Sequence, residues 1–251
     1  HLGHQKLFEI ASNIAAEKRQ GVALVTFNES PKLTLNQYSP EHLLHILNAS
    51  ERERRLKRAG VESLYLMDFT SRVANMTAKE FIDIYVKEAK ADTIVVGFDY
   101  TLGSDRKTAE DLKELFHGEV VVVPPVEDEK GKISSTRIRQ AILEGDVKEA
   151  GKLLGFPLPT RGVVVHGNAR GRTIGFPTAN LVNLDRTYMP ADGVYAVDVE
   201  IQRKVYRGMA SLGKNETFDG EEERFEVHIF DFSDDIYGET VIVSWLDRIR
   251  D

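Results

Sequence analysis

The sequence has 251 residues, which is enough for one large domain or for two domains that each bury a core. Hydrophobic residues make up 41% and charged residues 29%, as in folded globular proteins, and the lack of cysteine excludes disulfides, thiolate metal sites and a cysteine nucleophile. The net charge of -7 argues against a general nucleic-acid-binding protein. The lack of cysteine fits a reducing cytoplasm, so we expect a cytoplasmic protein. No apolar run approaches the roughly 18 residues that cross a bilayer, so we expect no membrane partner, and the charge predicts no nucleic-acid partner. The sequence leaves the oligomeric state open.

The first two thirds of the sequence alternate between helix and strand patterns. Apolar residues recur at helical spacing from Leu7 to Ile14, and the run VALVTF (22–27) is typical of a buried parallel strand. The pattern then repeats: Thr77 and Glu80 predict a capping box before the helix AKEFIDIYVKEA, which leads into TIVVGF, and AEDLKELFHG leads into EVVVVPP. We therefore expect an α/β domain with a parallel sheet, whose ligands bind at the carboxyl ends of the strands.

Two short motifs of this region lie at the start of predicted helices. HLGH, with His1, Gly3 and His4, opens the first helix, and a helix N-terminus favours anions. ISSTRIR (133–139) follows the VVVVPP strand and offers hydroxyls, backbone N–H groups and two arginines for phosphates. Each motif has a structural alternative, because two histidines near a terminus need no catalytic role and SST is a good helix cap.

The last third has no helical periodicity. GFPLPT (155–160) predicts a linker because its two prolines break both helix and central strand. The β-branched and aromatic runs that follow, among them GVYAVDVEI and TVIVSWLD, are separated by Gly, Asp and Glu clusters. We therefore expect a small antiparallel β-barrel at 160–251 after an α/β domain at 1–155.

The ordered motifs together resemble a known family. HLGH followed by ISSTRIR is similar to the pattern of the HxGH nucleotidyltransferases, which have a Rossmann-like fold, and VVGFDYTLGSDRK (95–107) resembles a segment of bacterial FMN adenylyltransferases. RGVVVHGNARGRTIGFPTANL (161–181) resembles the riboflavin kinase signature, and YMPADGVYAV and EVHIFDF follow in the family's order. Nearly the whole chain therefore resembles the bacterial bifunctional riboflavin kinase/FAD synthetases, although the family's C-terminal helix has no counterpart after LDRIRD.

For the first domain, the resemblance implies transfer of an adenylyl group from ATP to FMN, with release of pyrophosphate. His1 and His4 would donate hydrogen bonds to phosphate oxygens, and Gly3 lets the ligand approach the backbone. Asp99 would face the flavin or the nucleotide, and its structural alternative is an Asp that caps a loop. The residues expected to hold the triphosphate, with Mg²⁺ bridging it, are Ser134, Ser135, Thr136 and Arg139.

For the second domain, the resemblance implies phosphorylation of riboflavin to FMN by ATP. Glu226 would be the general base for the riboflavin 5′-hydroxyl. Its structural alternative is a carboxylate on the outward face of a strand. Thr178 and Asn180 would bind Mg²⁺ with the nucleotide, because this ion prefers oxygen ligands. The residues expected to form the rest of the nucleotide loop are Gly167, Gly171, Arg172, Gly175 and Pro177.

Two departures from the family pattern keep other functions open. ASLGKNETF (210–218) has Ser211 where the family usually has Asn and Glu216 where it usually has Pro. A negative charge near an anion site opposes binding, so one alternative is an enzyme that keeps only one activity. Another is a flavin-binding protein without catalysis. The leading prediction is the two-activity enzyme, with ATP, riboflavin, FMN, FAD and pyrophosphate as its small-molecule partners.

Overall fold

The computed structural model describes residues 1–166, 178–217 and 220–251, without the side chains of 215–223. These residues divide into two compact units. The α/β unit comprises Leu2–Leu43 and Ser50–Ile133, and the barrel unit comprises His1, Leu44–Ala49 and Ser134–Asp251. The chain therefore passes from one unit to the other more than once, which a simple division into two consecutive domains does not anticipate.

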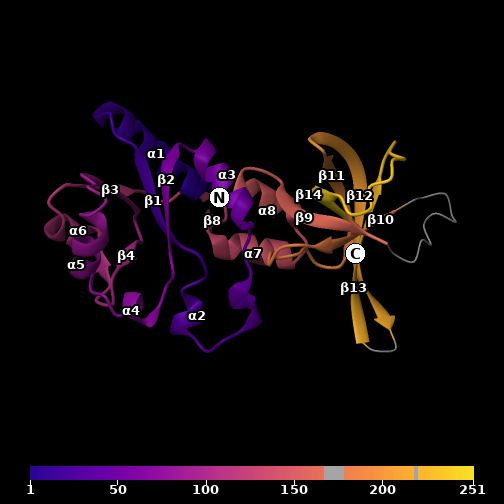
Figure 1. Cartoon of the computed structure of the whole chain (residues 1–251), viewed down its shortest axis with the longest axis horizontal. Coiled ribbons are helices and arrows are strands. Elements are labelled where there is room, and N and C mark those ends of the chain that lie inside the picture. The colour runs from indigo at the N-terminus through magenta and orange to yellow at the C-terminus, as the bar shows by residue number, and fades with distance from the viewer. Residues whose placement is uncertain (167–177, 218–219) are drawn as a thin grey trace. The chain divides into compact units, whose positions relative to one another are not determined.

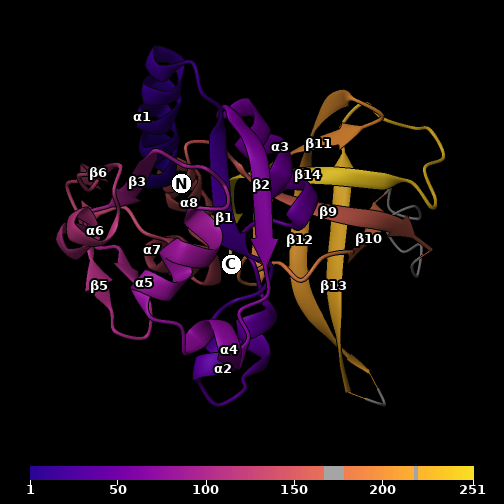
Figure 2. The same ribbon diagram turned by 60° about the vertical axis from the view of Figure 1, so that its left-hand side comes forward.

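The α/β unit contains the expected parallel strand pairs. β1 (Val22–Phe27) pairs with β2 (Val61–Met67), and β3 (Thr93–Gly97) pairs with β6 (Glu119–Val123), each as a two-stranded sheet. Figure 2 shows β1 and β2 side by side. Three of these strands coincide with the apolar runs VALVTF, TIVVGF and EVVVVPP, because β-branched residues pack well in a pleated sheet.

Helices and hairpins complete this unit. None of the described helices is long and apolar enough to span a bilayer. The helices are α1 (Leu2–Lys18), α2 (Lys32–Leu35), α3 (Ala49–Arg58), α4 (Ser71–Ala74), α5 (Ala78–Phe81), α6 (Ala109–Leu115), the 3₁₀ turn η1 (Pro40–Leu43) and the π-helical turn η2 (Ile82–Val86). The hairpins pair β4 (Thr101–Leu102) with β5 (Lys107–Thr108), and β7 (Glu127–Asp128) with β8 (Gly131–Lys132).

The predicted capping box of α5 is confirmed. The Thr77 hydroxyl accepts from the Glu80 backbone N–H, and the Glu80 carboxylate accepts from the Thr77 backbone N–H at 2.8 Å. The α-helix is much shorter than AKEFIDIYVKEA suggests, because the wider π turn η2 replaces its second half. Gly103 lies against this helix start with φ +78°, and a Cβ there would be 2.2 Å from the Ala78 nitrogen, so this turn requires glycine.

The barrel unit holds a closed six-stranded antiparallel barrel, as the last third of the sequence predicts. Its strand order is β10-β13-β12-β11-β14-β9, and Figure 1 labels these strands. The strands are β9 (Leu158–Val165), β10 (Ala179–Asn183), β11 (Gly193–Ile201), β12 (Lys204–Thr217), β13 (Gly220–Ile229) and β14 (Thr240–Arg250). In β11 every second residue, including Tyr195, Val197 and Val199, is fully buried, so side chains alternate between the barrel interior and its outer face.

The segment expected to be a linker is mostly structured. β9 begins at Leu158 and contains Pro159, which pairs with Ser244 of β14. Proline is tolerated there because β10 pairs with β9 only from Gly162 to Val165, so Pro159 needs no N–H for a second neighbour. Two helices before it, α7 (Ser135–Leu143) and α8 (Val147–Leu154), belong to the barrel unit, and α8 packs on β14 and β9.

The barrel interior contains the only tryptophan of the sequence. Trp245 is fully buried, its ring lies edge-on to Tyr195 at 5.1 Å, and its indole N–H donates to the Thr160 hydroxyl at 2.8 Å. The hydrogen bond joins β14 to β9 across one of the barrel's strand pairs.

Thr160→Val should lower the free energy of unfolding by about 1–3 kcal/mol, because it leaves the buried indole N–H without an acceptor. Urea unfolding followed by Trp245 fluorescence measures the change. Thr240→Val, at an exposed position of β14, is the matched control and should stay within about 0.5 kcal/mol of the wild type. Equal stability of the two variants would contradict a structural role for this hydrogen bond.

Candidate functional site

Three strands of the barrel bring predicted site residues onto one face. Asn180 of β10 lies opposite Glu226 of β13, and Glu226 also lies opposite Ser211 of β12. Directly opposed residues of antiparallel strands project to the same side of the sheet. The neighbours of Glu226 in β13, Phe225 and Val227, are buried in the barrel, so Glu226 faces outward beside Asn180 and Ser211.

A charged residue that the sequence reasoning missed lies on the same face. Arg224 is two residues before Glu226 in β13, and its Nη2 donates to the Ser211 hydroxyl at 3.2 Å. Its Nε is buried and has no hydrogen-bond partner within the described part of the chain. The strand period of two could have identified Arg224 as a neighbour of Glu226. Ser211, one of the departures from the family pattern, thus contacts an arginine at this face.

The proposed nucleotide loop lies only partly within the described residues. Thr178 immediately precedes β10 and is half-buried. The predicted residues Gly167, Gly171, Arg172, Gly175 and Pro177 all lie outside the described residues, as does the side chain of Glu216. Thr178 and Asn180 offer a hydroxyl and an amide oxygen, a donor set that fits a hard cation such as Mg²⁺.

The HLGH motif lies at the start of α1, as the sequence predicts. α1 begins at Leu2, so Gly3 and His4 are in its first turn and His1 directly precedes it. The pKa of His4 is lowered to about 4, mainly because burial desolvates the imidazolium. The His4 side chain is nevertheless exposed by surface area, so water weakens the effect of burial on its pKa. The ring is mainly neutral at pH 7 both at this lowered pKa and at the usual histidine pKa of about 6.5.

The ISSTRIR motif lies at the start of α7. Ser134 is the N-cap, and its hydroxyl accepts from the Arg137 backbone N–H at 3.4 Å, so the structural interpretation of this serine is confirmed. Ser135 and Thr136 are in the first turn, where backbone N–H groups and the helix dipole favour anions.

The structure distinguishes the two arginines of this motif. The guanidinium of Arg137 pairs with Glu149 of α8 at 3.2 Å, and both side chains are largely buried, so Arg137 joins two helices of the barrel unit. Arg139 Nη2 instead donates to the hydroxyl of Thr136 at 3.2 Å on the exposed side of α7. Arg139 and Thr136 are therefore the pair that remains accessible to a ligand.

Asp99 follows β3, at the carboxyl end where ligands bind to parallel sheets. Its carboxylate forms an ion pair with Lys132 of β8, and hydrogen bonding to this ammonium lowers the pKa of Asp99. The same ammonium lies 4.6 Å from the centroid of the exposed Phe98 ring. Asp99 is therefore ionised and forms an ion pair with Lys132. The sequence motifs did not indicate Lys132 as its neighbour.

The predicted residues are divided between the two units. His1 belongs to the barrel unit together with Ser134, Ser135, Thr136 and Arg139, whereas Gly3, His4 and Asp99 belong to the α/β unit. Thr178, Asn180 and Glu226 are in the barrel unit, where β10 and β13 bring the last two together.

Family models match both parts of the chain. A model described as FAD synthetase matches residues 1–137, and a model described as riboflavin kinase matches residues 154–251. The matches follow the order predicted from HLGH and ISSTRIR in the first part and from GFPTAN in the second.

Relatives with established names match the whole chain. The bifunctional riboflavin kinase/FMN adenylyltransferase of Listeria monocytogenes is 37% identical over 254 residues, covering 100% of this chain and 81% of that protein. The protein with the same name in Bacillus subtilis is 38% identical over 258 residues, with the same coverage of 100% and 81%.

A solved structure has the same fold. It is a crystal structure from Streptococcus pneumoniae, described as a macrolide-efflux protein, with 71% identity and a TM-score of 0.97, and the match covers 100% of this chain and 83% of that one. That description differs from the names of the curated relatives, whereas the two family models account for both parts of this chain. The chain therefore belongs to the family of bifunctional riboflavin kinase/FMN adenylyltransferases.

Proposed function

We propose that this chain makes FMN from riboflavin and ATP on the outer face of its barrel, and that it then makes FAD from FMN and a second ATP. The observation that carries the first step is the register that places Asn180 opposite Glu226. A carboxylate beside an amide oxygen supplies a proton acceptor next to a residue suited to a Mg-nucleotide. Family membership supports the pairing of the two activities.

In the first step, Glu226 takes the proton of the riboflavin 5′-hydroxyl as the hydroxyl oxygen attacks the γ-phosphorus of ATP. The bond from that phosphorus to the β-phosphate oxygen breaks, and ADP leaves. Such a reaction needs positioning and charge stabilisation rather than covalent catalysis. Arg224, on the same face as Glu226, adds positive charge near the transferred phosphoryl group.

Thr178 and Asn180 would hold Mg²⁺ through their side-chain oxygens. Among the described residues no group of three or more acidic or histidine side chains could hold a metal ion. A site with few protein ligands suits Mg²⁺, which usually keeps nucleotide oxygens and water molecules. When bound, the ion would neutralise phosphate charge.

In the second step, a phosphate oxygen of FMN attacks the α-phosphorus of ATP, and pyrophosphate leaves. His1 and His4 would donate hydrogen bonds to phosphate oxygens, with Gly3 allowing close approach to the backbone. Asp99 would face the flavin or the nucleotide. The residues proposed to hold the triphosphate are those at the start of α7: Ser134, Ser135, Thr136 and Arg139.

A chromatographic assay that separates riboflavin, FMN and FAD tests the proposal. With riboflavin and Mg-ATP, we expect FMN to appear first and FAD to follow, and with FMN and Mg-ATP we expect FAD. Accumulation of FMN alone would mean that the adenylyltransferase is inactive, and FAD only from supplied FMN would mean that the kinase is inactive. Tight flavin binding without consumption of ATP would support a binding protein instead.

The cytoplasmic location and the domain boundary near 155–160 stay predictions.

A further inference from the structure

A bidentate ion pair ties strand β9 to the loop that follows β10. Asp185 accepts from Arg161 Nε at 3.1 Å and from Arg161 Nη2 at 2.7 Å, one bond to each carboxylate oxygen. The Asp185 side chain is only 13% exposed, so water screens this pair less than an ordinary surface pair. The two parallel bonds also fix the orientation of the guanidinium.

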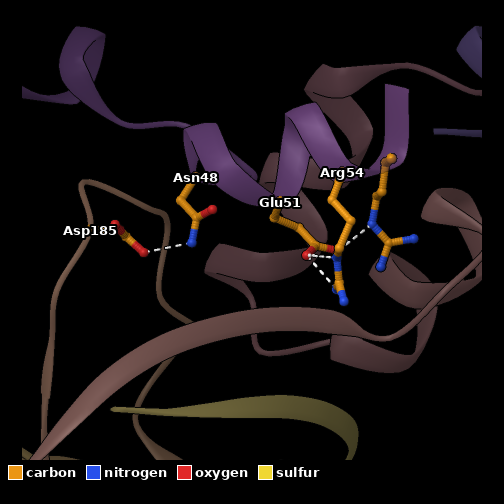
Figure 3. A network of polar contacts seen from close by, with 5 residues as sticks. Asn48, Glu51, Arg54 and Asp185 are labelled. Carbon is orange, nitrogen blue, oxygen red and sulfur yellow. Dashed lines mark hydrogen bonds and ion pairs between the residues drawn. The ribbon is translucent and has the colours of Figure 1, made fainter. Parts of the chain in front are cut away.

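The same carboxylate receives a third donor from a distant part of the sequence. Asn48 Nδ2 donates to Asp185 Oδ2 at 2.6 Å, and Figure 3 shows the amide pointing at the carboxylate. Asn48 lies in Leu44–Ala49, the segment that belongs to the barrel unit although its neighbours in sequence do not. We call this segment the strap.

Backbone hydrogen bonds attach the strap to the same loop. The His45 N–H donates to the Arg186 carbonyl at 2.8 Å, and the Tyr188 N–H donates to the His45 carbonyl at 3.0 Å. The strap leads directly into α3, where the buried carboxylate of Glu51 accepts from Arg54 (Figure 3). Arg55 Nε also donates to this carboxylate. The strap is therefore held by backbone and side-chain bonds, and its C-terminal end continues into an ordered helix.

These contacts act on the strand that carries the proposed Mg-nucleotide residues. β10 is five residues long, and its register pairs Asn180 with Val165 and Asn183 with Gly162 of β9. Arg161 is the next residue of β9, and its carbonyl accepts from the Leu184 N–H at 3.1 Å. A slip of β10 by one residue would turn Asn180 from the outer face into the barrel, so the contacts that fix this register also fix the site.

We propose that Asp185 is a positioning residue of the kinase site, which holds β10 and therefore Thr178 and Asn180 in place through Arg161, and that Asn48 of the strap supports it. This inference rests on the proposed roles of Thr178, Asn180 and Glu226. It makes a residue from the first half of the sequence part of the support of the riboflavin kinase reaction.

The test is Asp185→Asn in the full chain. The amide keeps the size of the side chain but offers one acceptor oxygen where the carboxylate offers two, so in either orientation its NH₂ group faces an N–H donor of Arg161. We expect kcat for FMN formation to fall about tenfold, because small displacements of positioning groups are costly. The Mg²⁺ concentration for half-maximal rate should rise several-fold, while KM for riboflavin and the rate of FAD formation from FMN stay unchanged.

The Mg²⁺ dependence separates positioning from a merely structural role. A general loss of folded protein would lower the rate without changing the Mg²⁺ concentration for half-maximal rate. The matched control is Asp198→Asn, which removes another carboxylate–arginine pair of the barrel, Asp198 with Arg207 at 3.2 Å between β11 and β12. This control should leave both kcat and the Mg²⁺ dependence unchanged.

A second variant keeps the proposal testable if Asp185→Asn does not fold. Asn48→Ala removes one of the three donors and should shift the Mg²⁺ dependence in the same direction by a smaller factor. Unchanged kcat and Mg²⁺ dependence in folded Asp185→Asn would overturn the proposal, and so would an unchanged Mg²⁺ dependence in Asn48→Ala if only that variant folds. Thr178→Ala distinguishes this failure from a wrong site: if it spares FMN formation, the proposed kinase site itself is wrong.

Discussion

Glu226→Gln is expected to lower the rate of FMN formation from riboflavin by about 10²- to 10⁴-fold, the range for loss of a general base. The amide has nearly the same shape as the carboxylate but cannot accept the proton of the 5′-hydroxyl at neutral pH. Because Glu226 faces outward and its strand neighbours supply the core, the barrel should keep its stability. Steady-state kinetics with riboflavin, and separately with FMN, measure the two activities.

The matched control for Glu226 is Glu200→Gln. Glu200 is a half-buried carboxylate on β11, in the same barrel but not on a strand next to β13. It should leave FMN formation at the wild-type rate. If Glu226→Gln lowers both activities equally, or neither, then Glu226 is a structural carboxylate and the base lies elsewhere.

His4→Ala is expected to lower the rate of FAD formation from FMN by about 10²- to 10³-fold, as for loss of one hydrogen bond to developing charge. FMN formation from riboflavin should stay at the wild-type rate. Because the pKa of His4 is lowered, the ring is mainly neutral and donates through its N–H at pH 7 and above. The ratio of the wild-type rate of FAD formation to the His4→Ala rate should therefore stay constant between about pH 7 and pH 8.

The control for His4 is His117→Ala, an exposed histidine of the same α/β unit. It should leave both activities unchanged. Loss of FAD formation in both variants would point to general damage to the unit, and full activity of His4→Ala would remove His4 from the proposed mechanism.

Local sequence patterns predicted the elements that local forces determine. Runs of β-branched and aromatic residues between Gly, Asp and Glu clusters predicted the barrel strands. The capping box of Thr77 and Glu80 was predictable because its two residues are only three positions apart. The same chemistry occurs at Thr108 and Asp111, where the aspartate bonds back to the Thr108 N–H at 2.7 Å, and the sequence reasoning overlooked it. The π turn after Phe81 had no local signal, because propensities do not separate it from an α-helix.

Contacts between residues that are far apart in the chain could not be predicted from the sequence patterns. Arg137 and Arg139 are equivalent as sequence letters, and only the packing of α8 against α7 shows that Arg137 has Glu149 as its partner. Asn48 and Asp185 are 137 positions apart, and neither belongs to a recognised motif. The family motifs located Glu226 and Asn180, and the register of β10 and β13 then showed that they are opposite each other.

The strap also affects the order in which the chain can fold during synthesis. The barrel unit needs Leu44–Ala49 from the early part of the chain and β14, at Thr240–Arg250, from the late part. The ribosome releases the chain from the N-terminus, so all residues of the α/β unit have emerged once Ile133 has. The strap cannot form its hydrogen bonds until the later segment with Asp185, Arg186 and Tyr188 has also emerged. Long-range strand pairing is slow to form, so we expect the barrel, with the proposed kinase residues Asn180 and Glu226, to form after the α/β unit.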